Sequence, residues 1–208
     1  MSPEQREVAG VLLTAQGSQF TANFIQMKVD LSQYRNPEYD HGAGALKRLV
    51  WHLFSKAFIH SQLPLPVSFK RMLLRVFGAK IGRGVVIKPN VNIKYPWFLE
   101  VGDHAWIGED VWIDNLVMVE IGPSCCLSQG AMLLTGNHDF TRATFNLITG
   151  NIRLEEGAWL GAKTVVCPGV TVGSHAVLTV GSVAVKNLEE WGIYQGNPAI
   201  LRKKRTVN

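Results

Sequence analysis

Charged residues are scarce in this chain of 208 residues: Asp, Glu, Lys and Arg make up 18% of it, against 47% hydrophobic residues. The net charge of +5 is a small excess, whereas a general nucleic-acid binder concentrates much more positive charge on one face. The composition therefore argues against a nucleic-acid partner, and it leaves ample apolar material for a core.

Cysteine is also rare. Cys125, Cys126 and Cys167 have neither the spacing of a disulfide framework nor that of a zinc site. The chain has no apolar run of about 18 residues, the length that spans a membrane, and its start, MSPEQREVAG, lacks the basic region and apolar run of a signal peptide. These absences predict a cytoplasmic protein with reduced thiols.

What the chain does have is a period of six. Such a period fits neither a helix nor a simple strand, but it fits a short strand and a turn, repeated, with three units closing one triangular coil. The pattern predicts an all-β-dominated fold, a parallel β-helix of about five coils over residues 81–185. The repeated aliphatic positions are Ile81, Ile87, Ile93, Val101, Ile107, Ile113, Ile121, Leu127, Leu133, Leu154, Leu160, Val166, Val172, Leu178 and Ala184.

The period is interrupted after Ile93, Ile113 and Leu133, which are twenty residues apart. All three insertions are therefore expected to leave the coil at the same corner. The third is long: LLTGNHDFTRATFNLITGN occupies residues 133–151 and contains His138. Long loops in compact folds are usually functional or disordered, so we expect residues 134–153 to form a protruding functional loop.

The segments on either side of the repeat differ from it. Residues 1–80 are expected to form an extension with two amphipathic helical stretches. The stretch 45–78 is open to two interpretations that can hold together: it caps the open end of the β-helix, or its interleaved basic and aromatic residues contact an anionic membrane surface. Residues 186–208 are expected to be irregular, with a short helix.

Four motifs carry a family resemblance: the six-residue coils, TGNHDF at 135–140, GAWLGAKTVVCPGVTVG at 157–173 and GNPA at 196–199. Together they resemble the hexapeptide-repeat acyltransferases. Residues 73–97, LLRVFGAKIGRGVVIKPNVNIKYPW, are similar to the colanic-acid-type O-acetyltransferases of exopolysaccharide pathways. The resemblance covers about residues 30–203. It implies a left-handed β-helix, a homotrimer, acetyl-CoA as donor, and an active site between neighbouring subunits.

Transfer of an acetyl group to a hydroxyl needs a base, and histidine suits this role because its ordinary pKa is near 6.5. The resemblance implies that His138 is this base. It also implies that the CoA arm lies on small residues beside an aromatic ring, with basic side chains near the phosphates. The matching positions are Trp159, Gly161, Ala162, Val180 and Gly181, with Lys186, Arg202, Lys203 and Lys204 as the cations. Candidates for binding the acceptor are Asp114, Asn115 and Asn137 at the insertion corner, with Asp139 and Arg142 beyond them.

A metal enzyme is the main chemical alternative, because γ-class carbonic anhydrases share this coil. They need three histidine ligands, and His138 has no histidine close to it in sequence. We therefore expect no metal. His104, placed on a coil face, and His175, placed at a corner, are interpreted as structural or solvated.

Three functions remain open. The first is an acetyl-CoA-dependent O-acetyltransferase acting on a sugar or glycan hydroxyl in exopolysaccharide biosynthesis. A lipid-linked acceptor is one form of it, with a cytoplasmic enzyme peripheral to the inner membrane. The second is a xenobiotic or small-molecule acetyltransferase, or an amino-sugar N-acetyltransferase. The third is a non-enzymatic trimeric scaffold.

Overall fold

The computed structural model describes residues 28–206 in two compact units. The larger unit comprises residues 37–138 and 147–206, and the smaller one comprises residues 28–36 and 139–146. The first part of the expected N-terminal extension, residues 1–27, lies outside the described residues.

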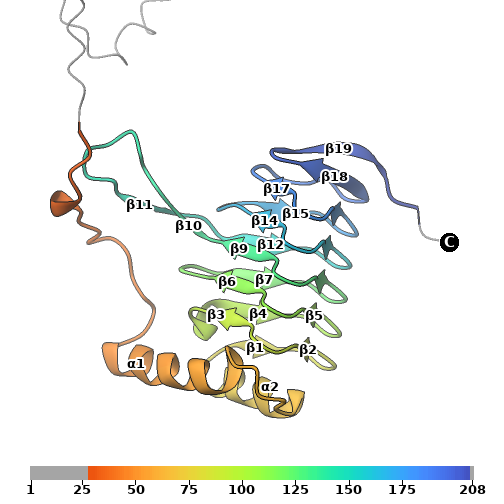
Figure 1. The fold of residues 1–208 in the computed structure, drawn as a ribbon, viewed down its shortest axis with the longest axis horizontal. Coiled ribbons are helices and arrows are strands. Elements are labelled where there is room, and N and C mark those ends of the chain that lie inside the picture. Colours follow the sequence, from red (N-terminus) through yellow and green to blue (C-terminus); the bar gives the residue numbers. More distant parts are fainter. Residues whose placement is uncertain (1–27, 207–208) are drawn as a thin grey trace, which may run out of the picture. The chain divides into compact units, whose positions relative to one another are not determined.

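The larger unit is built from short parallel strands on three sides, which we call sides A, B and C (Figure 1). Side A consists of β1 (Lys80–Ile81), β4 (Leu99–Val101), β7 (Val119–Ile121), β12 (Ile152–Leu154) and β15 (Thr171–Val172). Side B contains β2 (Val86–Ile87), β5 (Trp106–Ile107), β8 (Cys126–Leu127), β13 (Trp159–Leu160) and β16 (Val177–Leu178). Side C contains β3 (Asn92–Ile93), β6 (Trp112–Asp114), β9 (Met132–Leu134), β14 (Val165–Val166) and β17 (Val183–Ala184). Five complete coils result, and a bridge between Val172 and Leu188 begins a sixth turn. The predicted parallel β-helix is confirmed.

The core consists of the aliphatic positions of the six-residue period. All fifteen are buried, with Ile81 the most exposed at 8%. The strand register places them directly above one another: Ile107, for example, lies between Ile87 and Leu127. Each valine, leucine or isoleucine among them contributes about 1.5–3 kcal/mol when it is fully removed from water, so the stack of aliphatic residues is the main source of stability.

The corner between sides A and B and the corner between sides B and C turn through left-handed backbone in every coil, and the third corner does so at Gly169, with φ 78°, in the coil without an insertion. At the corner between sides A and B, His104 has φ 61° and His175 has φ 56°, and at the corner between sides B and C, Asn90 and Asp110 both have φ 58°. Asn and Asp tolerate this region better than most residues. His104 is thus a corner residue and not, as expected, a residue of a coil face. Gly84 is required beneath it, because a Cβ there would lie 2.3 Å from the ring of His104.

The third corner, between sides C and A, carries the insertions. Residues 94–98 follow β3, residues 115–118 follow β6, and residues 135–151 follow β9, so all three leave at one corner as predicted. The long insertion starts and ends as an antiparallel hairpin of β10 (Gly136–His138) and β11 (Leu147–Thr149), with His138 opposite Leu147. We call this hairpin the arm (Figure 1).

The smaller unit joins the tip of the insertion to a segment near the N-terminus. The backbone N–H of Asp30 donates to the carbonyl of Ala143 at 2.9 Å. Asp30 also caps the short 3₁₀ turn Leu31–Gln33 through its carboxylate, which accepts from the N–H of Ser32. The tip therefore has hydrogen-bonded partners of its own.

Two helices precede the first coil, as the spacing predicts: α1 (Ala45–Phe54), extended by a π-helical turn at Ser55–Ile59, and α2 (Val67–Val76). Trp51 of α1 is buried, and its Nε1 donates to the carbonyls of Ile93 at 3.2 Å and Lys94 at 2.9 Å. Leu73 and Leu74 of α2 are buried as well, and α2 packs on β1 and β2. The helices cap the first coil. None of the described helices is long and apolar enough to cross a membrane.

The expectation of an irregular C-terminal segment with a short helix is wrong. β18 (Gly192–Gly196) pairs with β16 in parallel and continues side B, and β19 (Ala199–Lys204) pairs with β18 in antiparallel. Gly192, Gly196 and Pro198 disfavour a helix here, whereas Tyr194 is buried at 7% exposure and gains from the strand conformation. This hairpin covers the last coil.

Cys125 generates a prediction about alkaline pH. Its thiol is 1% exposed and lies 2.9 Å from the carbonyl oxygen of Glu155, and burial raises its pKa to about 11. The unfolded thiol ionises near pH 9, whereas the folded thiol keeps its proton up to about pH 11. The free energy of unfolding should therefore fall by about 2–3 kcal/mol as the pH rises from 9 to about 11. Urea unfolding at pH 8 and pH 11 should show a smaller loss for Cys125→Ala than for the wild type. An equal loss in both proteins would contradict this prediction.

Candidate active site

The arm is fixed at its base by Thr135, a residue that the sequence analysis did not single out. Thr135 is fully buried, and its hydroxyl donates to the carbonyl of Asp114 at 2.8 Å and accepts from the N–H of Leu116 at 2.8 Å. The long insertion is thus bound to the insertion of the preceding coil. Tyr39 also stabilises the insertion of the preceding coil, because its hydroxyl donates to the carbonyl of Leu116 at 2.9 Å.

His138 is the last residue of β10, and it is partly exposed. Its backbone N–H donates to the Oδ1 of Asn137 at 2.8 Å, so Asn137 helps to set the conformation of the arm at the histidine. Because the base of the arm is anchored by Thr135, His138 is presented at a defined position beyond the corner between sides C and A.

The small residues predicted to contact CoA gather at a different corner. Gly161 and Ala162 follow β13, and Val180 and Gly181 follow β16, so all four lie at the corner between sides B and C in successive coils. The N–H of Gly181 donates to the carbonyl of Ala162 at 2.9 Å. We call these four residues the ledge.

The surface of the ledge is open to an approaching molecule. A Cβ on Gly181 would meet no atom within 4 Å, and Val180 is 71% exposed. Trp159 lies beside the ledge on side B, 45% exposed, and its Nε1 donates to the hydroxyl of Ser128 at 3.0 Å. Ser128, which sequence reasoning missed, holds the indole in place. An extended chain could therefore lie on backbone atoms with an aromatic wall next to it.

The predicted cations are not gathered in one place. Lys186 follows β17 at the corner between sides C and A, whereas Arg202 and Lys203 lie on β19 at the end of side B. All three are exposed, and none forms an ion pair with a described residue. Lys204, by contrast, pairs with Glu189 at 3.3 Å.

The histidine and the ledge do not share a corner. The arm leaves between sides C and A, the ledge lies between sides B and C, and the whole of side C separates these corners. A single chain therefore presents His138 and the expected donor-binding surface along two different edges.

Asn115 must be removed from the acceptor candidates. It is fully buried, and its Oδ1 accepts from the N–H of Tyr95 at 3.0 Å. Its Nδ2 donates to the carbonyls of Tyr95 at 2.6 Å and Phe98 at 3.1 Å. The amide therefore holds the first insertion together, and its burial keeps it out of reach of a sugar hydroxyl.

The other acceptor candidates lie in different surroundings. Asp114 is at the end of β6, where its carboxylate is 2.9 Å from the Nζ of Lys94. Asp139 and Arg142 belong to the smaller unit and pair with each other at 3.2 Å. A hydrogen bond from the Thr141 side chain is the main reason that the pKa of Asp139 lies below its usual range.

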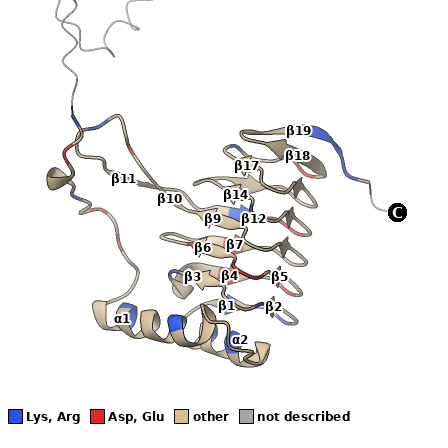
Figure 2. Ribbon diagram, in the orientation of Figure 1, with Lys and Arg blue, Asp and Glu red and all other residues tan. Residues whose placement is uncertain are grey.

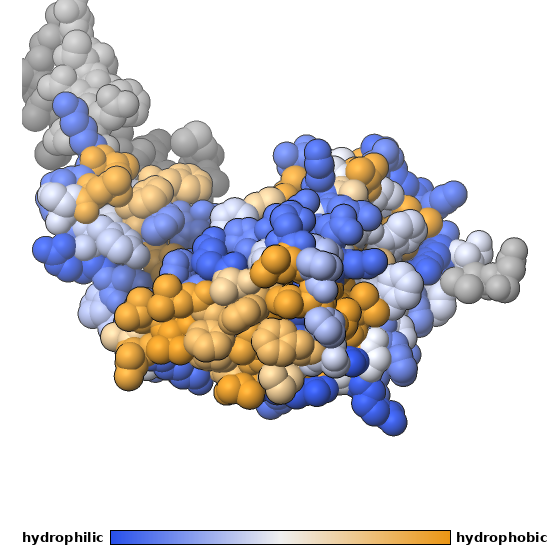
Figure 3. Space-filling view, turned by 60° about the horizontal axis from the view of Figure 1, so that its bottom comes forward, coloured by the Kyte–Doolittle hydropathy of each residue, from blue (hydrophilic) through white to orange (hydrophobic). Residues whose placement is uncertain are grey.

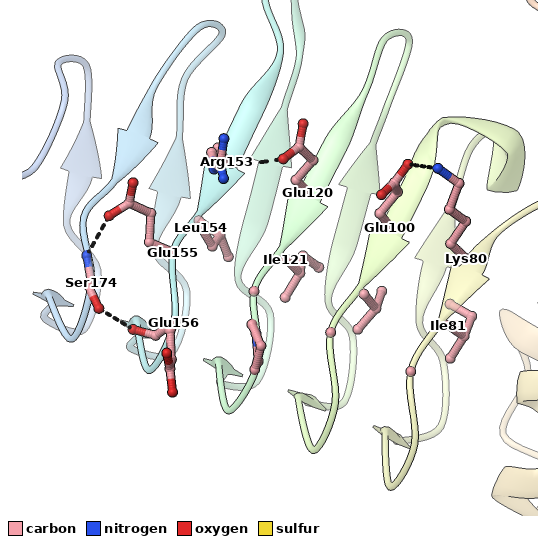
Figure 4. Close-up of a pocket in the computed structure, with 15 residues that line it drawn as sticks. Lys80, Ile81, Glu100, Glu120, Ile121, Arg153, Leu154, Glu155, Glu156 and Ser174 are labelled. Atoms are coloured by element: carbon pink, nitrogen blue, oxygen red, sulfur yellow. Dashed lines mark hydrogen bonds and ion pairs between the residues drawn. The ribbon is translucent and has the colours of Figure 1, made fainter.

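A shallow cavity of about 610 Å³ lies along side A and its edge (Figure 4), and it contains none of the predicted site residues. Four of its charged groups form two ion pairs: the Nζ of Lys80 is 2.6 Å from Glu100, and the Nε of Arg153 is 3.7 Å from Glu120. The N–H of Ser174 donates to Glu155 at 3.0 Å. Side A is therefore a solvated face with paired charges. Among residues 28–206, no three His, Cys, Asp or Glu side chains are grouped as metal ligands would be.

The structure belongs to the class of parallel β-helices with a protruding arm, and comparison with known proteins defines the family. No protein-family model matches the chain. It is 36% identical over 176 residues, 85% of this chain and 97% of the relative, to WcaF of Escherichia coli K12, which is named for an acetyltransferase role in colanic acid biosynthesis. It is 26% identical over 165 residues, 78% of this chain and 80% of the relative, to the galactoside O-acetyltransferase of the same organism.

Solved structures show the same fold. A hexapeptide-repeat acetyltransferase of Vibrio cholerae, complexed with acetyl coenzyme A, superposes with a TM-score of 0.72 at 20% identity, over 83% of this chain and 96% of that one. A galactoside acetyltransferase in complex with coenzyme A gives a TM-score of 0.69 at 22% identity, over 76% and 80% of the two chains. The chain belongs to the hexapeptide-repeat acetyltransferase family and has its left-handed β-helix, which confirms the expected family and fold.

The correction at Asn115 generates a prediction. Asn115→Ala would leave the N–H of Tyr95 and two carbonyls without partners in a buried place, so we expect a loss of about 2–4 kcal/mol of unfolding free energy. Asn137→Ala, a change of the same kind at an exposed position on the arm, should cost less than about 1 kcal/mol. Equal urea midpoints for the two variants would show that Asn115 is not the structural residue described here.

Proposed function

We propose that this chain transfers the acetyl group of acetyl-CoA to a hydroxyl of a sugar or glycan in exopolysaccharide biosynthesis, with His138 as the general base. The observation that carries the proposal is the arm: the most extensive interruption of a regular coil is anchored at its base and presents a histidine. The naming of WcaF and of the galactoside O-acetyltransferase supports both the acetyl donor chemistry and a sugar acceptor.

The ledge suits the arm of CoA. Gly161 packs so closely that a Cβ would lie 2.7 Å from the backbone N of Val180, and Gly181 has open space above it. The N–H of Gly161 donates to Leu178 and its carbonyl accepts from Thr164. The open surface for a pantetheine chain therefore lies over Val180 and Gly181, and Trp159 can pack along that chain. Lys186, Arg202 and Lys203 are available as counter-charges for phosphates. Because they lie at different places on the chain, they can contact different CoA molecules.

The chemistry follows from these roles. An imidazole nitrogen of His138 takes the proton of the acceptor hydroxyl as the oxygen attacks the thioester carbonyl. A C–O bond forms, the C–S bond breaks, and the proton passes from the imidazolium to the departing sulfur, so that free CoA and an acetyl ester result. Asp114, Asn137, Asp139 and Arg142 remain the candidates for binding the sugar.

We also propose a homotrimer, because the base and the ledge lie at different corners of one chain. A second copy can bring its ledge to the arm of the first, and a closed three-fold arrangement then gives three equivalent sites. The three sides differ in a way that suits this. Side A is charged, whereas side B exposes Trp106 at 59% and Trp159 at 45%, and side C exposes Trp112 at 40%. Sides B and C are therefore the surfaces that would gain from contact with neighbours.

The role of His138 can be tested by substitution. His138→Ala should lower acetyl transfer about 10²–10⁴-fold, the usual contribution of a general base, without changing the oligomeric mass. His52→Ala, at an exposed position on α1, should leave the rate unchanged and serves as the control. The measurement is CoA release with a panel of sugars, nucleotide sugars and amino sugars as acceptors. If His138→Ala kept more than about a tenth of the wild-type rate, His138 would not be the base.

The trimer can be tested through two changes in the same coil. Trp106→Ala removes an exposed aromatic residue from side B and should raise the concentration at which the trimer dissociates by at least about tenfold. Glu100→Ala on side A removes only an exposed ion pair and should leave that concentration unchanged. Sedimentation equilibrium measures both. A monomeric wild-type protein that is fully active would disprove the shared site.

A further inference from the structure

The outer faces of α1 and α2 carry apolar side chains that the fold does not cover. Figure 3 shows them as a continuous hydrophobic area with hydrophilic residues around it. We call this surface the helical apolar face. Its members, with their exposed fractions, are Leu46 at 74%, Leu49 at 57%, Leu53 at 60%, Phe54 at 41%, Met72 at 51% and Val76 at 73%.

This face is not needed for capping. The opposite faces of the two helices do that work, through the buried Trp51, Leu73 and Leu74. Lys70, which is 1% exposed, donates from its Nζ to the carbonyl of Lys88 at 3.1 Å and ties α2 to the first coil. Each helix thus has one face committed to the coil and one that is exposed, and a large exposed apolar patch usually marks an interaction site.

The charge around this face has one sign. From residue 41 to residue 99 the chain contains no Asp or Glu, and Figure 2 shows Lys and Arg but no acidic residue on α1 and α2. The helical stretch 45–78 has six Lys and Arg residues, and none of them forms an ion pair with a described residue. They are Lys47, Arg48, Lys56, Lys70, Arg71 and Arg75. Further along the chain, Lys80, Arg83 and Lys94 are paired with acids of the next coil.

We propose that the helical apolar face docks on an anionic lipid bilayer, with Leu49 and Leu53 among the side chains that enter the apolar boundary. Helices with an apolar face and basic residues beside it bind in the plane of such a surface, through buried apolar area and attraction to acidic headgroups. A second copy of this chain is a poorer occupant, because apposing two such faces would bring like charges together without a compensating acid.

Docking would hold the first coil against the bilayer. If the proposed sugar acetylation is correct, the acceptors best served by this position are sugars carried on a lipid. That extension rests on the proposed function, whereas binding to vesicles does not, so the two can fail separately.

The test is co-sedimentation of the full chain with lipid vesicles. Binding to phosphatidylcholine vesicles containing phosphatidylglycerol at low salt should be at least about tenfold tighter than binding to phosphatidylcholine alone, and it should weaken at about 0.15 M salt. Leu49→Glu with Leu53→Glu should reduce binding at least about tenfold. Lys56→Gln with Arg71→Gln should weaken it while leaving the apolar contact intact.

The matched control is Ile200→Glu with Leu201→Glu. These residues of β19 are 52% and 44% exposed, at the end of side B opposite to the helices. The double change alters the net charge by the same amount as Leu49→Glu with Leu53→Glu. The control should bind vesicles as the wild type does, and circular dichroism shows that each variant is folded. The proposal would be overturned if the wild type did not bind the anionic vesicles at low salt, or if the control lost as much binding as the Leu49→Glu, Leu53→Glu variant. It would also be overturned if that variant changed its oligomeric mass in the absence of lipid, because the face would then belong to a contact with a second copy.

Discussion

The stacking of one aliphatic residue on another, coil after coil, is the constraint on which the rest of the structure depends. Ile107 has Ile87 on one side of it and Leu127 on the other, and the strands that carry them exchange backbone hydrogen bonds in the same register. A two-residue strand has little stability by itself, so each coil depends on its neighbours. The two ends are the weak points of such a stack. In this chain α2 covers the first coil, and the β18–β19 hairpin covers the last.

This constraint also decides where function can lie. Insertions between sides A and B or between B and C would break the tight corners, where Asn90 and His104 adopt left-handed backbone. The remaining corner tolerates extra residues, and it does so in three successive coils. These insertions are joined to one another through buried polar groups: Asn115 binds the first, and Thr135 binds the third to the second. The arm is therefore built on the two insertions beneath it.

Much of this architecture could be predicted from the sequence, because a period of six over fifteen positions leaves few alternatives. The interruptions of this period also located the insertion corner and the arm. The C-terminal hairpin could not be found in this way, since its strands are set by pairing with β16 and not by the period. Asn115 illustrates the limit for single residues: an asparagine at a corner reads equally well as a sugar ligand or as a backbone partner, and only its burial and its three hydrogen bonds distinguish them. Sequence spacing likewise could not show that Lys186 follows a strand of side C, whereas Arg202 lies on a strand at the end of side B.

The parallel stack also explains why the surfaces differ so sharply from one another. Equivalent positions of successive coils fall in one row, so a side takes on the character of that row. On side A the row reads Lys80, Glu100, Glu120, Arg153 and Thr171, and its charges pair along the row. On side B the outward row contains Trp106, Cys126 and Trp159. A stack of this kind cannot form a deep pocket in its own core, which is filled by aliphatic side chains. It can instead offer several surfaces of different chemistry. We therefore propose that the site is assembled where an insertion from one corner meets a surface that belongs to another side. That geometric separation is the physical reason to expect a neighbouring chain to complete the site.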